Sequence, residues 1–191
     1  MSKEDEGFIR YYVMSHTKCF EVEIGKKRNG TLAPDFGKRL PYRGREYLLG
    51  GIAGRKSFFY NAFCVPVYYS SEQIKAACVQ IYRDLAQRDL TAKVMEFAET
   101  MGVEAPPVKI TGARNKFGSL TKTLNFSWRL VMAEDDVIDF VVVCTLASII
   151  EPRNSVQFWK TVEGILPDYL EQRRKLKMLM AQPIALENIA F

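Results

Sequence analysis

The feature that most constrains this chain is an apolar run in its C-terminal half. Residues Val137 to Ile150 are almost entirely apolar, and three acidic residues, Glu134, Asp135 and Asp136, come directly before them. Acidic side chains are favoured at a helix N-terminus, because the helix dipole leaves partial positive charge there. The pattern predicts a buried helix over Val137 to Ile150. Its longest uncharged stretch, Phe140 to Ile150, is shorter than the roughly 18 apolar residues of a membrane span, so we expect a soluble protein.

Length and composition favour one domain with a real core. The chain has 191 residues, of which 48% are hydrophobic. The four cysteines, Cys19, Cys64, Cys78 and Cys144, form no CxxC pair, and the charged first residues resemble no secretory signal. We therefore expect reduced thiols and a cytoplasmic location. The net charge of +5 favours solubility without identifying a partner.

Alternating apolar residues predict strands in the first third of the chain. We expect two strands between Phe8 and Ile24, with a turn near Ser15 to Lys18. Short strands over Tyr42 to Leu49 and Ser57 to Val67 are expected to follow. Together they predict a small, mostly antiparallel sheet.

Helical spacing begins at Ser70, which can form a capping box with Gln73. The pattern predicts one long helix, or two with a bend, ending at Gly102. Strands are expected over Val108 to Thr111 and Leu124 to Arg129. Strands and helices in this arrangement predict an α+β fold.

A last helical region is predicted to start at Ser155. Its apolar residues are expected to face inward, namely Phe158, Trp159, Val162, Ile165, Leu166 and Leu170. The basic segment Arg173 to Lys177 ends this region, and an apolar tail follows it.

Several short sequence motifs occur in a specific order. They are Leu40-Pro41-Tyr42-Arg43-Gly44-Arg45-Glu46-Tyr47, Gly118-Ser119, Leu124-Asn125-Phe126-Ser127-Trp128-Arg129-Leu130, Val137-Ile138-Asp139-Phe140-Val141-Val142-Val143, Asn154-Ser155, Phe158-Trp159 and Leu166-Pro167-Asp168-Tyr169. In this order they resemble the YgjP-like zinc metallopeptidase family, which is distantly similar to the SprT-type proteases. The resemblance implies an α+β zincin-like fold. It divides the chain into an abbreviated β-rich N-terminal portion (1–69), a core with a long central helix and a mixed sheet packed on the degenerate active-site helix (70–180), and a tail (181–191).

The resemblance also implies where a zinc site would lie. Such a family needs His-Glu-x-x-His on one helix, so that two histidines hold zinc and the glutamate acts on its water. Here that stretch reads Cys144-Thr145-Leu146-Ala147-Ser148, and the position of a third histidine is Asn154. The ligand positions are therefore Cys144, Ser148 and Asn154, and the base position is Thr145. We expect neither bound zinc nor catalysis.

The most consistent function is then a pseudo-enzyme that keeps its cleft for a peptide or protein. The segment Lys122 to Arg129 is predicted to be an exposed edge strand along which such a partner docks, with Asn125, Ser127 and Arg129 facing solvent. The family's Trp-Gly-Ser-Cys word reads Phe117-Gly118-Ser119-Leu120 in this chain. The expected cleft residues are Phe117, Gly118, Ser119, Asn125, Ser127 and Glu151.

Two other hypotheses stay open. The first is an active metal-dependent hydrolase with an atypical site around Cys144 and Glu151, which lie seven residues apart on what would be one helical face. The second, less favoured, is a basic nucleic-acid-associated module that uses the clusters at Lys26 to Arg28, Lys38 to Arg45 and Arg173 to Lys177. The only histidine, His16, falls in a predicted turn and is not expected to be a catalytic base. The sequence indicates no membrane partner and does not reveal the oligomeric state.

Overall fold

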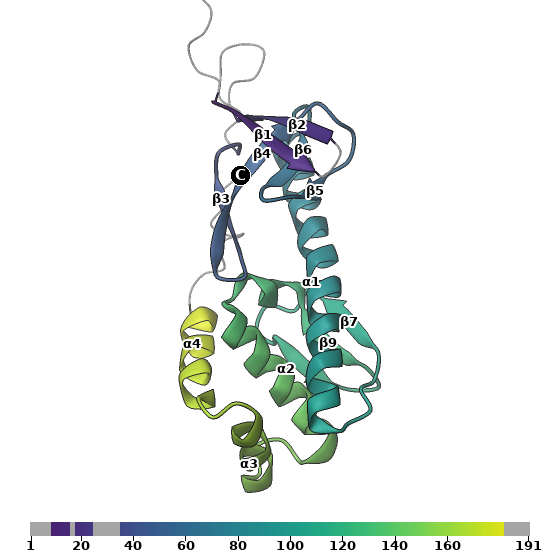
Figure 1. The fold of residues 1–191 in the computed structure, drawn as a ribbon, viewed down its shortest axis with the longest axis vertical. Helices are drawn as coiled ribbons and strands as arrows, with labels where there is room; N and C mark the ends of the chain where they lie inside the picture. Colours follow the sequence, from purple (N-terminus) through teal and green to yellow (C-terminus); the bar gives the residue numbers. More distant parts are fainter. Residues whose placement is uncertain (1–8, 16–17, 25–34, 182–191) are drawn as a thin grey trace, which may run out of the picture. The chain divides into compact units, whose positions relative to one another are not determined.

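The α+β class is confirmed by a computed structural model, which describes residues 9–15, 18–24 and 35–181 (Figure 1). His16, the cluster at Lys26 to Arg28 and residues 182–191 of the tail lie outside the described residues. The elements of the described part are β1 (Ile9–Ser15), β2 (Lys18–Ile24), β3 (Arg39–Tyr42), β4 (Arg45–Ile52), β5 (Phe58–Phe59), β6 (Phe63–Pro66), α1 (Ser71–Met101), β7 (Val108–Thr111), β8 (Gly118–Leu120), β9 (Leu124–Ser127), the 3-10 helix η1 (Trp128–Met132), α2 (Asp135–Ile150), α3 (Val156–Ile165) and α4 (Tyr169–Ala181). Within those ranges, no helix is both long and apolar enough to cross a membrane.

The chain forms two compact units. Among the described residues, the first contains β1, β2, β5, β6, most of β3 and β4, and the start of α1, and the second contains residues 42–45 and the chain from Tyr82 to Ala181. The predicted boundary between residues 69 and 70 is a different division, based on sequence pattern, and it stays a prediction.

The sheet of the first unit is mixed, so the expectation of a mostly antiparallel sheet is only partly right. Its strand order is β1-β2-β4-β6-β5, and β3 pairs with β4. β4 and β6 run parallel, whereas β1 with β2, β2 with β4, and β5 with β6 are antiparallel. The single strand predicted over Ser57 to Val67 is wrong, because the chain turns at Asn61 (φ +51°) between β5 and β6.

The long helix α1 begins as the sequence predicts. Ser70 Oγ accepts from the Gln73 N–H at 3.3 Å, and Gln73 Oε1 accepts from the Ser70 N–H at 2.9 Å, which is the expected capping box. The helix is continuous to Met101, and Gly102 follows with φ +64°, a conformation that glycine adopts without strain. One helix, rather than two with a bend, is therefore formed.

In the second unit, a small sheet has the order β7-β9-β8. β9 pairs with β7 in parallel and with β8 antiparallel, so it is the middle strand. The predicted edge strand over Lys122 to Arg129 is therefore wrong. Its expected solvent-facing residue Ser127 is 0% exposed, and η1 replaces the strand from Trp128 onward. The open edge of this sheet on that side belongs to β8.

The apolar run forms the buried helix predicted for it. α2 begins at Asp135 with Glu134 as its N-cap residue, and every residue from Phe140 to Ala147 is buried. It packs against β8, α3 and α4 (Figure 1). The helix start is fixed from outside by the turn between β3 and β4, where Arg43 donates two hydrogen bonds to the Asp135 carboxylate at 2.6 and 3.0 Å.

Two helices occupy the last predicted helical region. Ser155 caps α3 by accepting from the Phe158 N–H at 3.0 Å, as expected. The chain leaves the helix at Leu166, just before Pro167, and α4 begins at Tyr169. Because of this break Leu170 is 64% exposed, so its predicted inward orientation is wrong.

Candidate functional site

On the face of α2 that would carry metal ligands, the side-chain hydroxyl groups are hydrogen-bonded to the backbone of the same helix. Cys144 and Ser148 lie one helical turn apart, as the sequence predicts. Ser148 Oγ donates to the Cys144 carbonyl oxygen at 2.8 Å. Between them in sequence, Thr145 Oγ1 donates to the Val141 carbonyl oxygen at 2.7 Å. Both hydroxyl groups therefore donate their hydrogen bonds to carbonyl oxygens of the same helix, as Ser and Thr within helices often do.

The base position at Thr145 is also covered from outside. Thr145 is 0% exposed, and β8 crosses α2 directly above it. A Cβ atom at Gly118 would lie 2.4 Å from Thr145 Oγ1 and 2.8 Å from Val141 Cγ1, which is closer than such atoms ever approach. A side chain at position 118 would therefore clash with α2, and the Gly118 backbone lies against the base position.

The thiol of Cys144 is neutral at physiological pH. Burial raises its pKa to about 12, against the smaller lowering effect of the guanidinium groups of Arg153 and Arg173. A thiol must lose its proton to act as a metal ligand or nucleophile. Cys144 is therefore poorly suited to either role.

Arg153 lies beside the predicted ligand positions, and sequence reasoning gave it no role. Its Nε donates to Ser148 Oγ at 3.3 Å, and its Nη2 lies 3.5 Å from the Gly118 carbonyl oxygen, at the limit of a hydrogen bond. A fixed positive charge thus faces both α2 and β8 at the place where a cation would have to bind. The sequence feature that could have indicated a role for Arg153 is its position next to Asn154, one of the predicted ligand positions.

Two open pockets flank Arg153 within the second unit. The first, which we call the β8 pocket, has a volume of about 430 Å³ and is lined by Lys116, Ser119, Leu120, Ser148, Ile149, Ile150, Glu151, Pro152 and Arg153. The second, the α4 pocket, has a volume of about 340 Å³. It is lined by residues of α2, the β8 strand and the loop before it, α3, α4 and the segment after α2.

The predicted site residues are divided between these pockets. Phe117, Gly118, Cys144 and Asn154 line the α4 pocket, whereas Ser119, Ser148 and Glu151 line the β8 pocket. Asn154 is exposed and has φ +68°.

Cys144 and Glu151, predicted to share one helical face, line different pockets, and a joint role stays a prediction. α2 ends at Ile150, and Glu151 has extended backbone with φ −126° and ψ 143°. Glu151 is thus the C-cap residue of α2, and its N–H still donates to the Ala147 carbonyl oxygen at 3.0 Å.

Asn125 and Ser127 line neither pocket. The Asn125 side-chain amide donates to Thr121 Oγ1 and to the Thr123 carbonyl oxygen, both at 2.9 Å. Ser127 Oγ donates to the Ala113 carbonyl oxygen at 2.6 Å. Their polar groups hold the β8–β9 hairpin and the loop before it, and a role in binding stays a prediction.

The donor set does not fit a zinc ion. Zinc in proteins is held by thiolates, imidazoles or carboxylates. The three expected positions carry a neutral thiol, a hydroxyl bonded to its own helix and an exposed amide, with Arg153 beside them. In the described ranges, no three His, Cys, Asp or Glu side chains are grouped so that they could hold a metal ion.

The chain matches a known protein family. The family model described as YgjP-like, metallopeptidase domain, matches residues 11–179. This range contains α2, most of the two units and, except for Met180, every residue that lines the two pockets. Neither a curated protein nor a solved structure matches the chain significantly.

Proposed function

The chain belongs to the YgjP-like metallopeptidase family, and from this membership we propose that it is a non-catalytic member that binds a peptide or protein segment. Metallopeptidases need a metal ion and a group that takes a proton from its bound water. The observation that carries the proposal is the packing at Thr145. At the base position the side chain is a hydroxyl bonded to the Val141 carbonyl, and the Gly118 backbone lies against it.

The open edge of β8 supports the retained binding function. Phe117 accepts from the Ser127 N–H at 3.0 Å, and Ser119 is paired with Asn125, so both are directed toward β9. Because main-chain groups alternate along a strand, those of Gly118 and Leu120 face away from β9. A peptide in extended form can pair with this edge, since main-chain hydrogen bonding needs no catalytic residue. The edge strand is β8, in place of the segment expected from the sequence.

The free thiols support a cytoplasmic location. Cys64, Cys78 and Cys144 are all buried and unpaired by disulfides. Burial raises the pKa values of Cys64 and Cys78 to about 11 and about 12. Free thiols of this kind fit a reducing compartment, in which disulfides rarely form.

Turnover of a protein substrate tests the loss of catalysis. The purified chain, supplied with equimolar zinc, is expected to leave unstructured casein intact over many hours. Chelator-sensitive cleavage that disappears in Cys144→Ala would contradict the proposal and would favour the atypical hydrolase.

A backbone test uses the quadruple variant Cys144→His, Ser148→His, Asn154→His and Arg153→Gln. This variant supplies three imidazoles and removes the competing charge. If this variant binds zinc, we expect it to remain without peptidase activity, because Thr145 still stands at the base position; zinc-dependent cleavage by it would contradict the proposal.

Binding at the β8 edge can be tested with the neutral, end-blocked peptide Ser-Gln-Leu-Gln-Phe-Gln-Ser and fluorescence anisotropy. Leu120→Pro removes an N–H that faces the open edge and is tolerated there. We expect it to weaken binding about five-fold, as the loss of one hydrogen bond does. Lys122→Gln in the adjacent turn is the control. Equal affinity of Leu120→Pro and the unaltered chain would place binding elsewhere.

A further inference from the structure

The α4 pocket combines an apolar floor with a basic rim. Its floor is formed by Phe117, Phe140, Val141 and Phe158, all of which are buried, and by the thiol of Cys144. A volume of about 340 Å³ is sufficient for one or two large apolar side chains. The floor therefore favours a ligand that carries an apolar group.

The rim of the pocket carries four positive charges. Lys116 and Arg153 lie on one side, and Arg173 and Lys177 lie one turn apart on α4. Among the described residues, no carboxylate lines the pocket, and none of the four cations has a salt bridge. Four cations gathered without carboxylate partners are electrostatically unfavourable unless an anion joins them.

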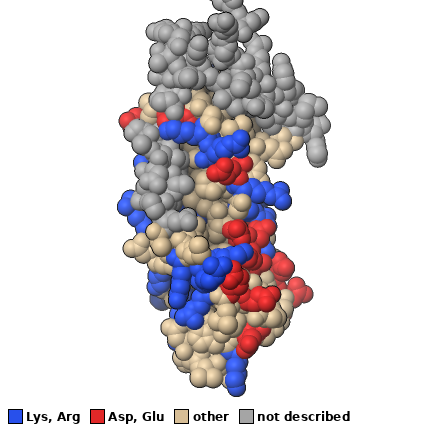
Figure 2. Space-filling model, turned by 90° about the vertical axis from the view of Figure 1, so that its left-hand side faces the viewer, with Lys and Arg blue, Asp and Glu red and all other residues tan. Residues whose placement is uncertain are grey.

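In contrast to Arg173 and Lys177, the other two basic residues of α4 near the pocket are paired with carboxylates. Lys175 Nζ lies 2.6 Å from Glu134 Oε2 and 2.7 Å from Asp136 Oδ2. Arg174, in turn, is paired with Glu171. Figure 2 shows basic side chains gathered beside a band of acidic ones on this face of the molecule. One side of the helix thus has neutralised cations, whereas the pocket side does not.

The aromatic side chains of the pocket argue against stacking with nucleobases. The Trp159 ring is stacked with Tyr169 at a centroid distance of 5.4 Å, and the Arg173 guanidinium lies 4.7 Å from the Trp159 ring centre. Phe117 and Phe158 are 6% and 1% exposed. Single-stranded nucleic acid binding relies on free aromatic faces, which these residues do not offer.

The contact with Trp159 also restricts the Arg173 side chain before an anion binds. A guanidinium that is already stacked on an aromatic ring loses little further freedom when it binds a carboxylate, and it can donate two parallel hydrogen bonds. Arg173 and Arg153 both lower the pKa of the Cys144 thiol, although burial outweighs them, so both positive charges reach the pocket floor.

We infer that the α4 pocket binds an acidic segment of a partner protein, with an apolar side chain on the floor and carboxylates on the cations of the rim. This inference rests on the proposed function and specifies its ligand. Carboxylates before and after the apolar residue can meet Lys116 and Arg153 on one side of the pocket and Arg173 and Lys177 on the other. The apolar residue between them provides the contact that inorganic anions lack.

A matched pair of end-blocked peptides tests the inference by fluorescence anisotropy on the full chain. The acidic peptide is Ser-Glu-Leu-Glu-Phe-Glu-Ser, and the neutral one has Gln in place of Glu. We expect the acidic peptide to bind at least about ten-fold more tightly, with a preference that decreases as salt rises. Equal affinities, or no binding of the acidic peptide up to millimolar concentration, would overturn the inference.

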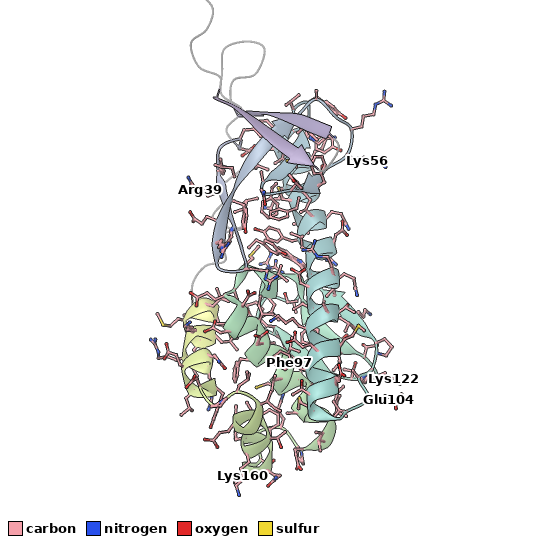
Figure 3. The ribbon with its side chains drawn as sticks, in the orientation of Figure 1. Arg39, Lys56, Phe97, Glu104, Lys122 and Lys160 are labelled. Atoms are coloured by element: carbon pink, nitrogen blue, oxygen red, sulfur yellow. The ribbon has the colours of Figure 1, made fainter. Side chains whose placement is uncertain are left out.

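Variants locate the charges responsible. Lys177→Gln and the double variant Arg173→Gln with Lys177→Gln are expected to weaken acidic-peptide binding progressively, while Lys160→Gln leaves it unchanged. Lys160 is an exposed cation that points outward from α3 (Figure 3), and it lines neither pocket. Lys177→Gln keeps the contact between Arg173 and Trp159, so its effect reports charge rather than packing. An equal loss in Lys160→Gln would show a non-specific charge effect and contradict the inference.

Two further outcomes would assign the pocket to another occupant. Tighter binding of an oligothymidine of similar charge, lost in the same variants, would indicate nucleic acid. Binding of the acidic peptide only after deletion of residues 182–191 would make the chain's own tail the occupant. Binding of the neutral peptide that Leu120→Pro weakens, without preference for the acidic peptide, would leave the proposed function intact and reject only the acidic ligand.

Discussion

Two neighbouring regions of the second unit offer opposite conditions to a ligand. Around Thr145, β8 lies directly on α2, and the side chain is fully buried and hydrogen-bonded to its own helix. Around Arg153 and Arg173, the charged side chains are exposed and have no carboxylate partner in the described part of the chain. The comparison sets a closed, buried position beside an exposed, basic one. Under the proposed function, the packing at Thr145 excludes the chemistry, while the exposed cations around Arg153 and Arg173 provide recognition.

The largest expected effect comes from placing a carboxylate in the closed region. Thr145→Glu should lower the free energy of unfolding by at least about 3 kcal/mol, because the larger ionisable side chain is buried where Gly118 leaves no space. Ser148→Glu is the matched control, since Ser148 is half-buried and contacts Arg153. It should change stability by less than about 1 kcal/mol. Urea unfolding of both variants provides the measurement, and equal losses would contradict the comparison.

A smaller effect is expected where the strand crosses the helix. Gly118→Ala should destabilise the chain by about 1–3 kcal/mol, because its Cβ would overlap Thr145 Oγ1 and Val141 Cγ1. Gly164→Ala in α3, where nothing lies within 4 Å of the added Cβ, should instead stabilise by about 0.5–1 kcal/mol. Thermal and urea unfolding can distinguish the two signs. A neutral Gly118→Ala would show that β8 moves away easily and that the base position can be opened.

The last prediction concerns the pKa of the Cys144 thiol, which burial raises and nearby positive charge lowers, and its effect appears only at alkaline pH. Its pKa is raised to about 12, so the folded state keeps the thiol protonated while the unfolded chain releases the proton above about pH 8.5. The resulting stability is present below that pH and is lost as pH rises. The Cys144→Ala variant should therefore show a shallower fall in unfolding free energy between pH 9 and 11, by up to about 1.4 kcal/mol per pH unit. Identical slopes would mean that Arg153 and Arg173 stabilise a thiolate, which would restore Cys144 as a ligand.

The helices of this fold were predictable from the sequence, because the residues that start and end a helix act locally. The acidic residues before Val137, the Ser70 capping box and the glycine at position 102 each act within one or two helical turns, and each prediction is confirmed. The edge assignment failed because pairing is not local. β8 has only the residues Gly118–Leu120 and no alternation, so nothing in the sequence shows that it covers one side of β9.

Only part of the candidate site was within reach of sequence reasoning. The resemblance located Cys144, Thr145, Ser148 and Asn154 on or next to one helix, and the structure places the first three on α2. The role of Arg153 depends on where α2 ends, and the basic rim gathers cations from separate elements. The close contact of Gly118 with Thr145 likewise requires the three-dimensional crossing of strand and helix.

The central claim is that this member of the family has no metal site, and zinc content tests it most directly. The untagged chain, purified without chelator, is incubated with a two-fold excess of zinc, dialysed against metal-free buffer and analysed by mass spectrometry for the metal. We predict less than about 0.1 zinc per chain, because no set of deprotonated ligands is available in the described residues to hold the ion. Retention of about one zinc per chain, removable by chelator and abolished in Cys144→Ala, would contradict the account.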